Sequence, residues 1–421
     1  MTAVLVAVMA FSMLQLYLVG TLGPALMADI GFSRARLGWL TSTAFIVAAV
    51  FSPVAGRLAD RLGARRCMSW LLLVVAAALG LIALSPSYGV LVAAVALGGV
   101  PQALANPATN RAISTGVDPV RRGAVTGLKQ AGVLVGAFVA GLPLTWLTLL
   151  WSWRGAVGVM AVLALVTAGG VRRCVPAEPD LPQAAGPRAG PREAVVRGGS
   201  SRAARWLAAF SVALGAGNGS VNTYLPLFAT ERLGMSPGTA GALVAVLAVA
   251  GIMGRIGWTR LAQRSALGER LPWLLTGAAA LAATLFTLSG SAGVWMVWPA
   301  VAGVGGCAVA ANAVSILVVI NHARSDSAAR DTALVTAGFF TGFVIGPPLF
   351  AAASQAGGYG VAWLGVAAAF AAAALLARGW QACEHVGSGR RTDPGIPCGS
   401  LAGKGGAQDC GRAPGTQALP E

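Results

Sequence analysis

The sequence predicts an all-α integral membrane protein with twelve transmembrane helices in two pseudo-symmetric six-helix bundles. Of its 421 residues, 56% are hydrophobic and only 10% are charged. Soluble domains are nearer a quarter charged, so these charges are too few to cover a surface in water. The apolar residues also come in runs of about 20, the length that a helix needs to cross a hydrocarbon core of about 30 Å.

Glycine, proline and charge clusters divide the chain into twelve such runs. They are 4–27, 38–56, 67–85, 88–110, 123–146, 154–171, 206–229, 238–258, 272–289, 293–320, 332–355 and 360–379. Residues 172–205 are rich in Pro, Gly and Arg and cannot bury enough apolar surface to fold. We interpret them as a cytoplasmic linker between an N-terminal bundle, 1–171, and a C-terminal bundle, 206–380. The tail, 381–421, has no periodicity and is expected to be disordered.

Basic residues predict the orientation of the chain. With the N-terminus inside, 25 of the 30 Lys and Arg fall in cytoplasmic loops, the linker or the tail, and four fall outside. This count assigns Arg255 to a cytoplasmic loop. The positive-inside rule therefore predicts a multi-pass protein of the cell (inner) membrane with both termini cytoplasmic. Because the basic residues are spread over loops rather than gathered in a stripe, nucleic acid is not expected as a partner.

An internal repeat relates the two bundles. A constant offset of 203 residues matches Gly31 with Gly234, and Arg57-Leu58-Ala59 with Arg260-Leu261-Ala262. Parallel duplication of a six-helix unit is typical of certain transporters.

Glycines with four-residue spacing form a second repeat. Gly132 and Gly136 lie 206 residues before Gly338 and Gly342. Such small faces predict helices that pack closely against a neighbour.

The segment after the second run reads Gly56-Arg57-Leu58-Ala59-Asp60-Arg61-Leu62-Gly63-Ala64-Arg65-Arg66. It resembles the loop signature of the major facilitator superfamily between its second and third helices, and the resemblance covers residues 1–380. It implies a secondary transporter whose two halves rock around a central cavity at the midplane. A Gly-Pro followed by Gly-Gly, typical of the fifth helix in drug antiporters, is missing, since 136–143 reads GAFVAGLP.

This motif is predicted to act as a conformational latch. Its residues are Gly56, Asp60, Arg61, Gly63 and Arg65, with Arg260 and Arg264 in the second copy. Asp60 can face the positive N-terminus of a neighbouring helix, whereas the arginines either bind headgroups and carbonyls or only enforce orientation. Gln263 replaces Asp60 in the second copy, so we expect an asymmetric latch.

Amide side chains inside the spans are candidates for substrate binding, because polar groups there need partners and avoid lipid. They are Gln15, Gln102, Asn106, Asn110, Gln130, Asn218, Asn222 and Asn312. All except Gln130 lie on the first, fourth, seventh and tenth spans, which by the resemblance line the central cavity. The alternative role is hydrogen bonding between helices.

Lys129 is the one charge that the count places inside a span. Burying a lysine near a helix centre costs about 2.5–3.5 kcal/mol, which favours a partner for its ammonium. An anionic substrate is one such partner, and snorkelling to the cytoplasmic interface is the alternative. Arg111 is either a second anion contact or an ordinary topology charge. No carboxylate is predicted mid-membrane, where a cation-exporting proton antiporter usually has one.

These patterns predict a secondary active transporter of a small organic solute, with an organic anion favoured. The alternatives are a proton-coupled efflux pump for a hydrophobic drug or secondary metabolite, and a transporter-like membrane sensor. An enzyme is not expected, because the chain lacks a G-x-x-x-x-G-K-[ST] loop and both histidines lie at or beyond cytoplasmic span ends. We expect a monomer in the lipid bilayer with a small-molecule substrate, no cofactor and no metal ion. Whether a proton is transported together with the substrate is left open by the sequence.

Overall fold

The computed structural model describes residues 1–176, 202–264, 270–322 and 328–389. These residues form helices and their connections, and no strand occurs among them. The compact body is Met1–Ala382. Most of the predicted linker and most of the predicted tail lie outside the described residues.

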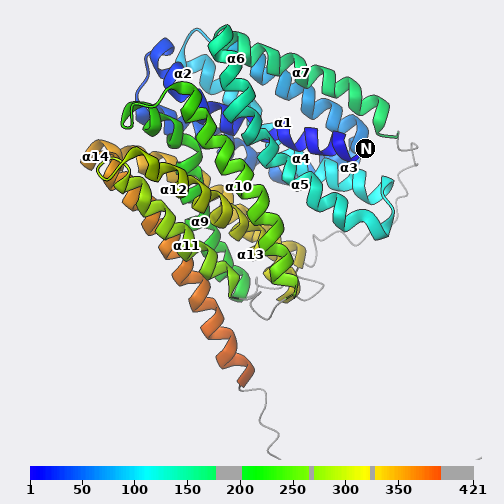
Figure 1. Cartoon of the computed structure of the whole chain (residues 1–421). Helices are drawn as coiled ribbons and strands as arrows, with labels where there is room; N and C mark the ends of the chain where they lie inside the picture. The colour runs from blue at the N-terminus through cyan, green and yellow to red at the C-terminus, as the bar shows by residue number, and fades with distance from the viewer. Residues whose placement is uncertain (177–201, 265–269, 323–327, 390–421) are drawn as a thin grey trace, which may run out of the picture. The chain divides into compact units, whose positions relative to one another are not determined.

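The first half of the body holds the first six predicted spans. Its elements are α1 (Thr2–Thr21), α2 (Gly23–Ile30), α3 (Arg34–Ala83), α4 (Tyr88–Gly116), η1 (Pro119–Arg121), α5 (Arg122–Val139), η2 (Ala140–Leu144), α6 (Thr145–Leu150) and α7 (Trp153–Cys174). The second half follows the predicted linker. Its elements are α9 (Arg202–Glu231), α10 (Pro237–Arg264), α11 (Leu271–Leu288), η3 (Val294–Met296), α12 (Val297–Val304), η4 (Gly305–Val309), α13 (Ala310–His322) and α14 (Ala328–Gly389). Figure 1 shows their paths.

Two helices are far longer than one membrane crossing needs. α3 has 50 residues and α14 has 62, and each contains two of the predicted spans. Gly63 (φ 75°, ψ 160°) interrupts α3 and Gly358 (φ 77°, ψ −179°) interrupts α14. Positive φ is readily adopted only by glycine. In the described part of the chain, nine helices, including these two, are long and apolar enough to cross a membrane.

The signature segment 56–66 is helical on both sides of Gly63, although the sequence predicted a loop. Its Arg, Leu and Ala residues all favour helices, so the backbone keeps its helical hydrogen bonds on both sides of Gly63. The change of direction is confined to the one residue that can adopt it without strain.

Glycines bring two helix pairs into backbone contact, one in each half. A Cβ at Gly136 of α5 would lie 2.6 Å from the Ala10 carbonyl oxygen of α1, and one at Gly338 of α14 would lie 2.5 Å from that of Ala208 in α9. Real Cβ atoms do not approach so closely. The close packing predicted from the repeated glycines is therefore present in both halves.

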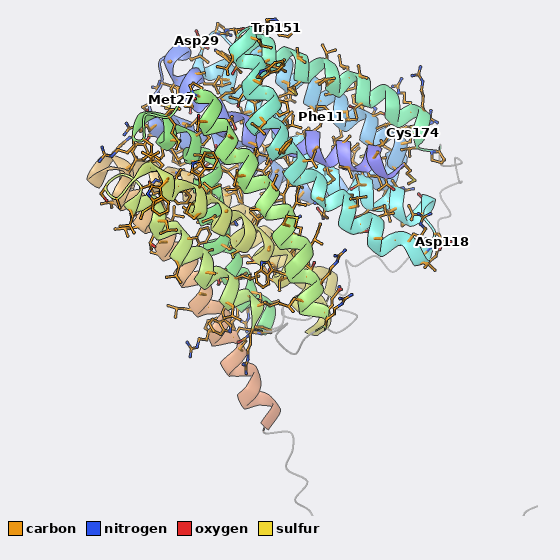
Figure 2. The ribbon with its side chains drawn as sticks, in the orientation of Figure 1. Phe11, Met27, Asp29, Asp118, Trp151 and Cys174 are labelled. Atoms are coloured by element: carbon orange, nitrogen blue, oxygen red, sulfur yellow. The ribbon has the colours of Figure 1, made fainter. Side chains whose placement is uncertain are left out.

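The surface of the helices is largely apolar. The exposed fractions of Val50, Leu281 and Trp151 are 75%, 73% and 67%. Such side chains suit contact with lipid tails rather than water. Figure 2 shows Asp29 and Trp151 at one end of the first half and Asp118 and Cys174 at the other, which are the predicted outer and inner ends respectively.

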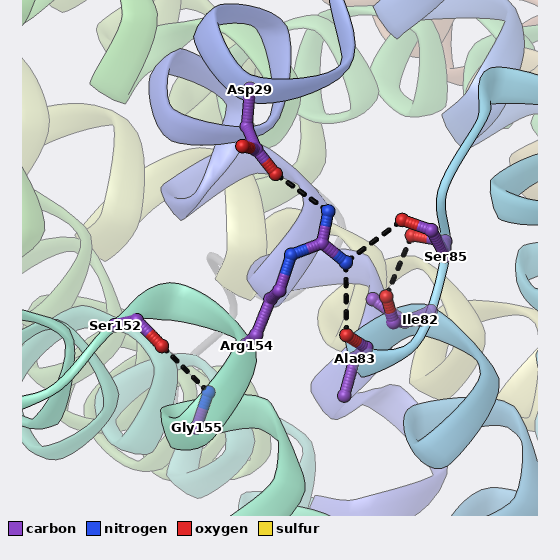
Figure 3. A network of polar contacts seen from close by, with 7 residues as sticks. All are labelled: Asp29, Ile82, Ala83, Ser85, Ser152, Arg154 and Gly155. Atoms are coloured by element: carbon purple, nitrogen blue, oxygen red, sulfur yellow. Dashed lines mark hydrogen bonds and ion pairs between the residues drawn. The ribbon is translucent and has the colours of Figure 1, made fainter.

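One guanidinium joins three helices at the predicted outer end of the first half (Figure 3). Arg154, at the start of α7, donates from Nη2 to Asp29 Oδ2 at 2.7 Å and from Nη1 to the carbonyls of Ala83 and Ser85 at 3.1 and 2.8 Å. The carbonyls at the end of α3 lack helical partners, and Arg154 satisfies one of them. This predicted loop charge thus joins α2, α3 and α7.

The two halves contact each other toward their predicted outer ends. Ser42 Oγ on α3 donates to the Val344 carbonyl of α14 at 2.6 Å. The ring of Phe45 lies 4.5 Å from that of Phe343, centroid to centroid. At a third point, a Cβ at Gly141 would lie 2.6 Å from the Gly241 carbonyl oxygen. The helices that meet there are α3 with α14 and η2 with α10.

An ion pair also crosses between the halves at this end. Arg34 Nη2 lies 2.6 Å from Glu231 Oε2, with the two side chains 38% and 31% exposed. Tyr359 donates its hydroxyl to the same carboxylate oxygen at 2.7 Å, and the Arg34 guanidinium lies 4.9 Å from the centre of its ring. Tyr224 donates its hydroxyl to the Arg34 carbonyl at 2.8 Å. We call Arg34, Glu231 and Tyr359 the outer cluster.

Candidate functional site

Lys129 is buried on α5, and its ammonium contacts α4. Nζ donates to Asn110 Oδ1 at 2.5 Å, to Thr109 Oγ1 at 2.8 Å and, most weakly, to Asn106 Oδ1 at 3.4 Å. The side chain is 0% exposed, so it does not extend to the interface. Three neutral oxygens accept the three N–H donors of the ammonium. They satisfy its hydrogen bonds but leave its charge unbalanced.

Helical spacing on α4 creates this group of acceptors. Asn106, Thr109 and Asn110 stand at i, i+3 and i+4, so they share one face of the helix. Asn106 Oδ1 also accepts from Gln130 Nε2 at 3.2 Å. The structure thus brings together four of the predicted site residues, Asn106, Asn110, Lys129 and Gln130. Thr109 was not predicted, although its place on the same face is a signal that could have found it.

Arg255 lies inside α10 and not in a loop, so its assignment to a cytoplasmic loop is wrong. It stands nine residues before the helix ends at Arg264, or about 13 Å along the axis. The side chain is half-buried. Its Nη1 donates to the Gln130 carbonyl at 3.1 Å, while its buried Nε has no hydrogen-bond partner among the described residues. Lys129 is therefore not the only charge inside a span; the predicted run 238–258 already contained Arg255.

The other predicted amides lie apart from the Lys129 group. Gln15 Nε2 donates to the Val95 carbonyl at 2.8 Å, which ties α1 to α4. Gln102 is buried with both amide atoms unpartnered among the described residues, as is Nδ2 of Asn218. Asn222 and Asn312 are half-buried.

The acidic side chains whose positions the structure describes are all occupied elsewhere. They are Asp29, Asp60, Asp118 and Glu231; Asp331 and Glu384 also belong to α14, but their side chains lie outside the description. Three of them form ion pairs: Asp29 with Arg154, Asp60 with Arg111, and Glu231 with Arg34. The fourth, Asp118, accepts from the Val120 amide at the start of η1. Lys129 on α5 and Arg255 on α10 thus contact neutral polar groups, and neither has a carboxylate partner among the side chains that the structure describes.

Comparison with known proteins identifies the family. The model of the Major Facilitator Superfamily matches residues 5–330. The chain belongs to the major facilitator superfamily. The family predicted from the loop signature is therefore confirmed. Its members are multi-pass membrane transporters that bind small-molecule substrates and work by alternating access.

Two solved structures of superfamily transporters match most of the chain. They are crystal structures of a bacterial homologue of the human lysosomal transporter Spinster, inward-facing, one unoccupied and one occupied. Their TM-scores are 0.67 and 0.66, and each alignment has 16% identity and covers 92% of this chain and 96% of the other. Identity this low shows a shared fold and no more. A search of curated proteins finds no match.

Asp60, the acidic residue of the superfamily signature, contacts α4. Arg111 donates from Nη1 to Asp60 Oδ1 at 3.3 Å and to the Asp60 carbonyl at 3.0 Å. The partner of Asp60 is thus a guanidinium within the same half. Arg111, considered above as a second anion contact, is occupied by this pair. The remaining latch residues lie on α3, around the break at Gly63, and on the last turns of α10. They are Gly56, Arg61 and Arg65, and Arg260 and Arg264.

Asp60→Asn should leave the protein inserted but slow transport by up to about fivefold, because an exposed ion pair is worth about 0–1 kcal/mol. Gln263→Ala, the equivalent change in the second copy of this superfamily motif, should have little effect. Initial transport rates in proteoliposomes with equal amounts of protein measure both. Equal losses from the two substitutions would contradict an asymmetric latch.

Proposed function

We propose that this protein is a secondary active transporter of a small organic anion. The observation that carries the proposal is the pair formed by Lys129 and Arg255. One cation comes from each half of the molecule, and Arg255 donates to the carbonyl of Gln130, the residue that follows Lys129. No carboxylate of the described residues balances either charge.

An unbalanced cation is costly inside a membrane, since insertion of a lysine or arginine at the helix centre costs about 2.5–3.5 kcal/mol. A bound anion recovers part of that cost and gains charge-assisted hydrogen bonds. Because Lys129 and Arg255 belong to different halves, an anion held by both would contact α5 and α10 together. Rocking of the halves would then change its surroundings, which is what alternating access requires.

We infer that the conformation described here faces inward. Apart from the hydrogen bond of Arg255 to Gln130, the contacts between the halves reported above lie toward the end that the basic residues predict to be outside. The two Spinster homologue structures similar to this chain are also inward-facing.

Both termini and the linker are proposed to lie in the cytoplasm, with the protein in the cell (inner) membrane. Reporter fusions after Val171, Arg205 and Arg378 should all report a cytoplasmic location, because basic residues concentrate in these loops. The measurement compares a reporter active only in the cytoplasm with one active only outside. An outside signal from the linker fusions would overturn the twelve-span topology and the repeat with it.

Counterflow in proteoliposomes tests the function. Purified full-length protein would be preloaded in turn with small carboxylates, phosphate esters and hydrophobic cationic drugs, and exchange of the labelled compound measured in each case. Exchange of carboxylates or phosphate esters supports the proposal. Exchange of drugs alone would favour an efflux pump, and binding without exchange of any compound would favour a membrane sensor.

A further inference from the structure

We propose that the transported anion is a dicarboxylate, with one carboxylate for Lys129 and the other for Arg255. This inference rests on the proposed function and narrows its substrate class. It comes from the number of unbalanced charges, from the separate fastening of the two cations, and from one underused N–H donor on each of them.

The first observation is the number of buried positive charges without a carboxylate partner. Among the described cations, Arg34, Arg111 and Arg154 have carboxylate partners, and most of the other arginines are exposed to solvent. Lys129 and Arg255 have buried nitrogen atoms and no carboxylate partner. A ligand with one negative charge would leave one buried cation unbalanced. A ligand with two negative charges neutralises the whole site, which is the favourable arrangement in a medium of low dielectric constant.

The two cations form hydrogen bonds with different elements of the protein. The ammonium of Lys129 contacts side chains of α4, whereas the guanidinium of Arg255 contacts the backbone of α5 at Gln130. Lys129 and Gln130 are consecutive residues of α5, but one contact is made by the lysine side chain and the other by the backbone carbonyl of Gln130. Two carboxylates at the ends of one short molecule fit this arrangement better than a single carboxylate shared by both cations.

Each cation also has a donor that a carboxylate can use. Lys129 reaches Asn106 only at 3.4 Å, beyond the usual 3.2 Å limit of an N–H···O bond. Asn106 would keep its shorter hydrogen bond from Gln130 if a carboxylate oxygen replaced it on the ammonium. Nε of Arg255 has no partner in the described part of the chain. A guanidinium binds a carboxylate through two parallel N–H donors, and this Nε can supply one of them.

The test compares two probes that differ by one charge. Succinate at neutral pH carries two charges, and its monomethyl ester has almost the same shape with one. Binding to full-length protein in detergent, and counterflow in proteoliposomes, should favour succinate over the ester by about tenfold or more. The series extends to dicarboxylates with one fewer and with two more carbons, each against its own monoester.

Charge-removing variants sharpen the comparison. Lys129→Gln and Arg255→Gln each leave one cation, so each should bind the monoester as well as the dicarboxylate, or better. Arg36→Gln is the matched control, because Arg36 lies at the outer end of α3 and contacts Tyr88 in its own half. It should keep the wild-type preference. Lys129→Met is the second choice should Lys129→Gln fail to fold.

The possible failures are distinguishable. If the wild-type protein takes monoesters as readily as dicarboxylates of every length, the dicarboxylate inference is wrong while anion transport stands. If it exchanges no anion of any kind in the counterflow panel, the proposed function is wrong as well. A dicarboxylate preference that survives in both glutamine variants would also overturn the assignment of one charge to each cation.

Discussion

Lys129→Ala is expected to reduce anion transport by roughly 30-fold or more while the protein still folds. Truncating one partner of a buried charge pair costs about 2 kcal/mol or more, and every 1.4 kcal/mol is about tenfold. Here the missing partner would be the ammonium that neutralises the substrate. Folding should be preserved, because the change removes a buried charge that no carboxylate of the described residues balances. Counterflow in proteoliposomes measures the loss, and the melting temperature checks folding.

Two further variants separate charge from shape. Lys129→Arg should recover transport only partly, because a planar fork is not a compact ammonium. Thr109→Val removes one acceptor of the Lys129 ammonium, at 2.8 Å, but leaves the charge in place. Thr109→Val should reduce anion transport less than Lys129→Ala does. Normal transport by Lys129→Ala, with loss in Asn106→Ala or Asn222→Ala, would indicate a neutral site lined by amides and favour the drug or metabolite exporter.

Glu231→Ala is expected to shift the protein toward a conformation open at the outer end. The substitution removes the ion pair with Arg34, which joins the halves, and a hydrogen bond from Tyr359, which lies within the second half. The pair is partly exposed, so we expect up to about 1 kcal/mol, or up to about a fivefold shift in the ratio of the two conformations. Spin labels at Ala28→Cys and Arg232→Cys, in a cysteine-free background, measure the separation of the halves.

The chain offers a matched control for this experiment. Arg36→Gln removes a charge two residues from Arg34, but its contacts with Tyr88 stay within the first half. It should leave the distances between the labels unchanged. Exchanging the charges, as Arg34→Glu with Glu231→Arg, should restore much of the wild-type distribution. If Glu231→Ala leaves that distribution unchanged, the ion pair does not hold the outer end closed.

The outer cluster has no symmetric copy. The repeat offset of 203 residues relates Arg34 to Pro237 and Glu231 to Ala28, neither of which carries a charge. The duplicated helices therefore close against each other with an ion pair on one side of the pseudo-symmetry axis only. Two halves with matching backbones thus differ in the side chains that hold them together.

Much of the fold could be predicted because the bilayer restricts the choices. Runs of about 20 apolar residues, breaks at glycine and the four-residue glycine spacing each have one favourable arrangement in lipid. The contacts of Gly132 with Val6 and of Gly338 with Ala208 follow the repeat seen in the sequence. Lys129 could be singled out for the same reason, since a charge in an apolar run is conspicuous.

The partners at the site could not be predicted, because spacing gives a face of a helix and not its neighbour. Gln102, Asn106 and Asn110 share one face of α4, yet only the last two contact Lys129. Thr109 is an ordinary hydroxyl in sequence, and packing alone makes it an acceptor. Arg255 was misplaced because it stands near the end of its apolar run, while α10 continues past that run to Arg264.

If Lys129 and Arg255 hold the anion as proposed, their two unbalanced charges make the empty carrier sensitive to membrane voltage. Each elementary charge that crosses the whole field changes its energy by about 2.3 kcal/mol per 100 mV. When the water-filled opening moves from one side to the other, the site takes on the potential of the side it faces. A potential negative inside therefore favours the inward-facing empty carrier, whereas a carrier loaded with a dianion is electrically neutral and turns over indifferent to voltage.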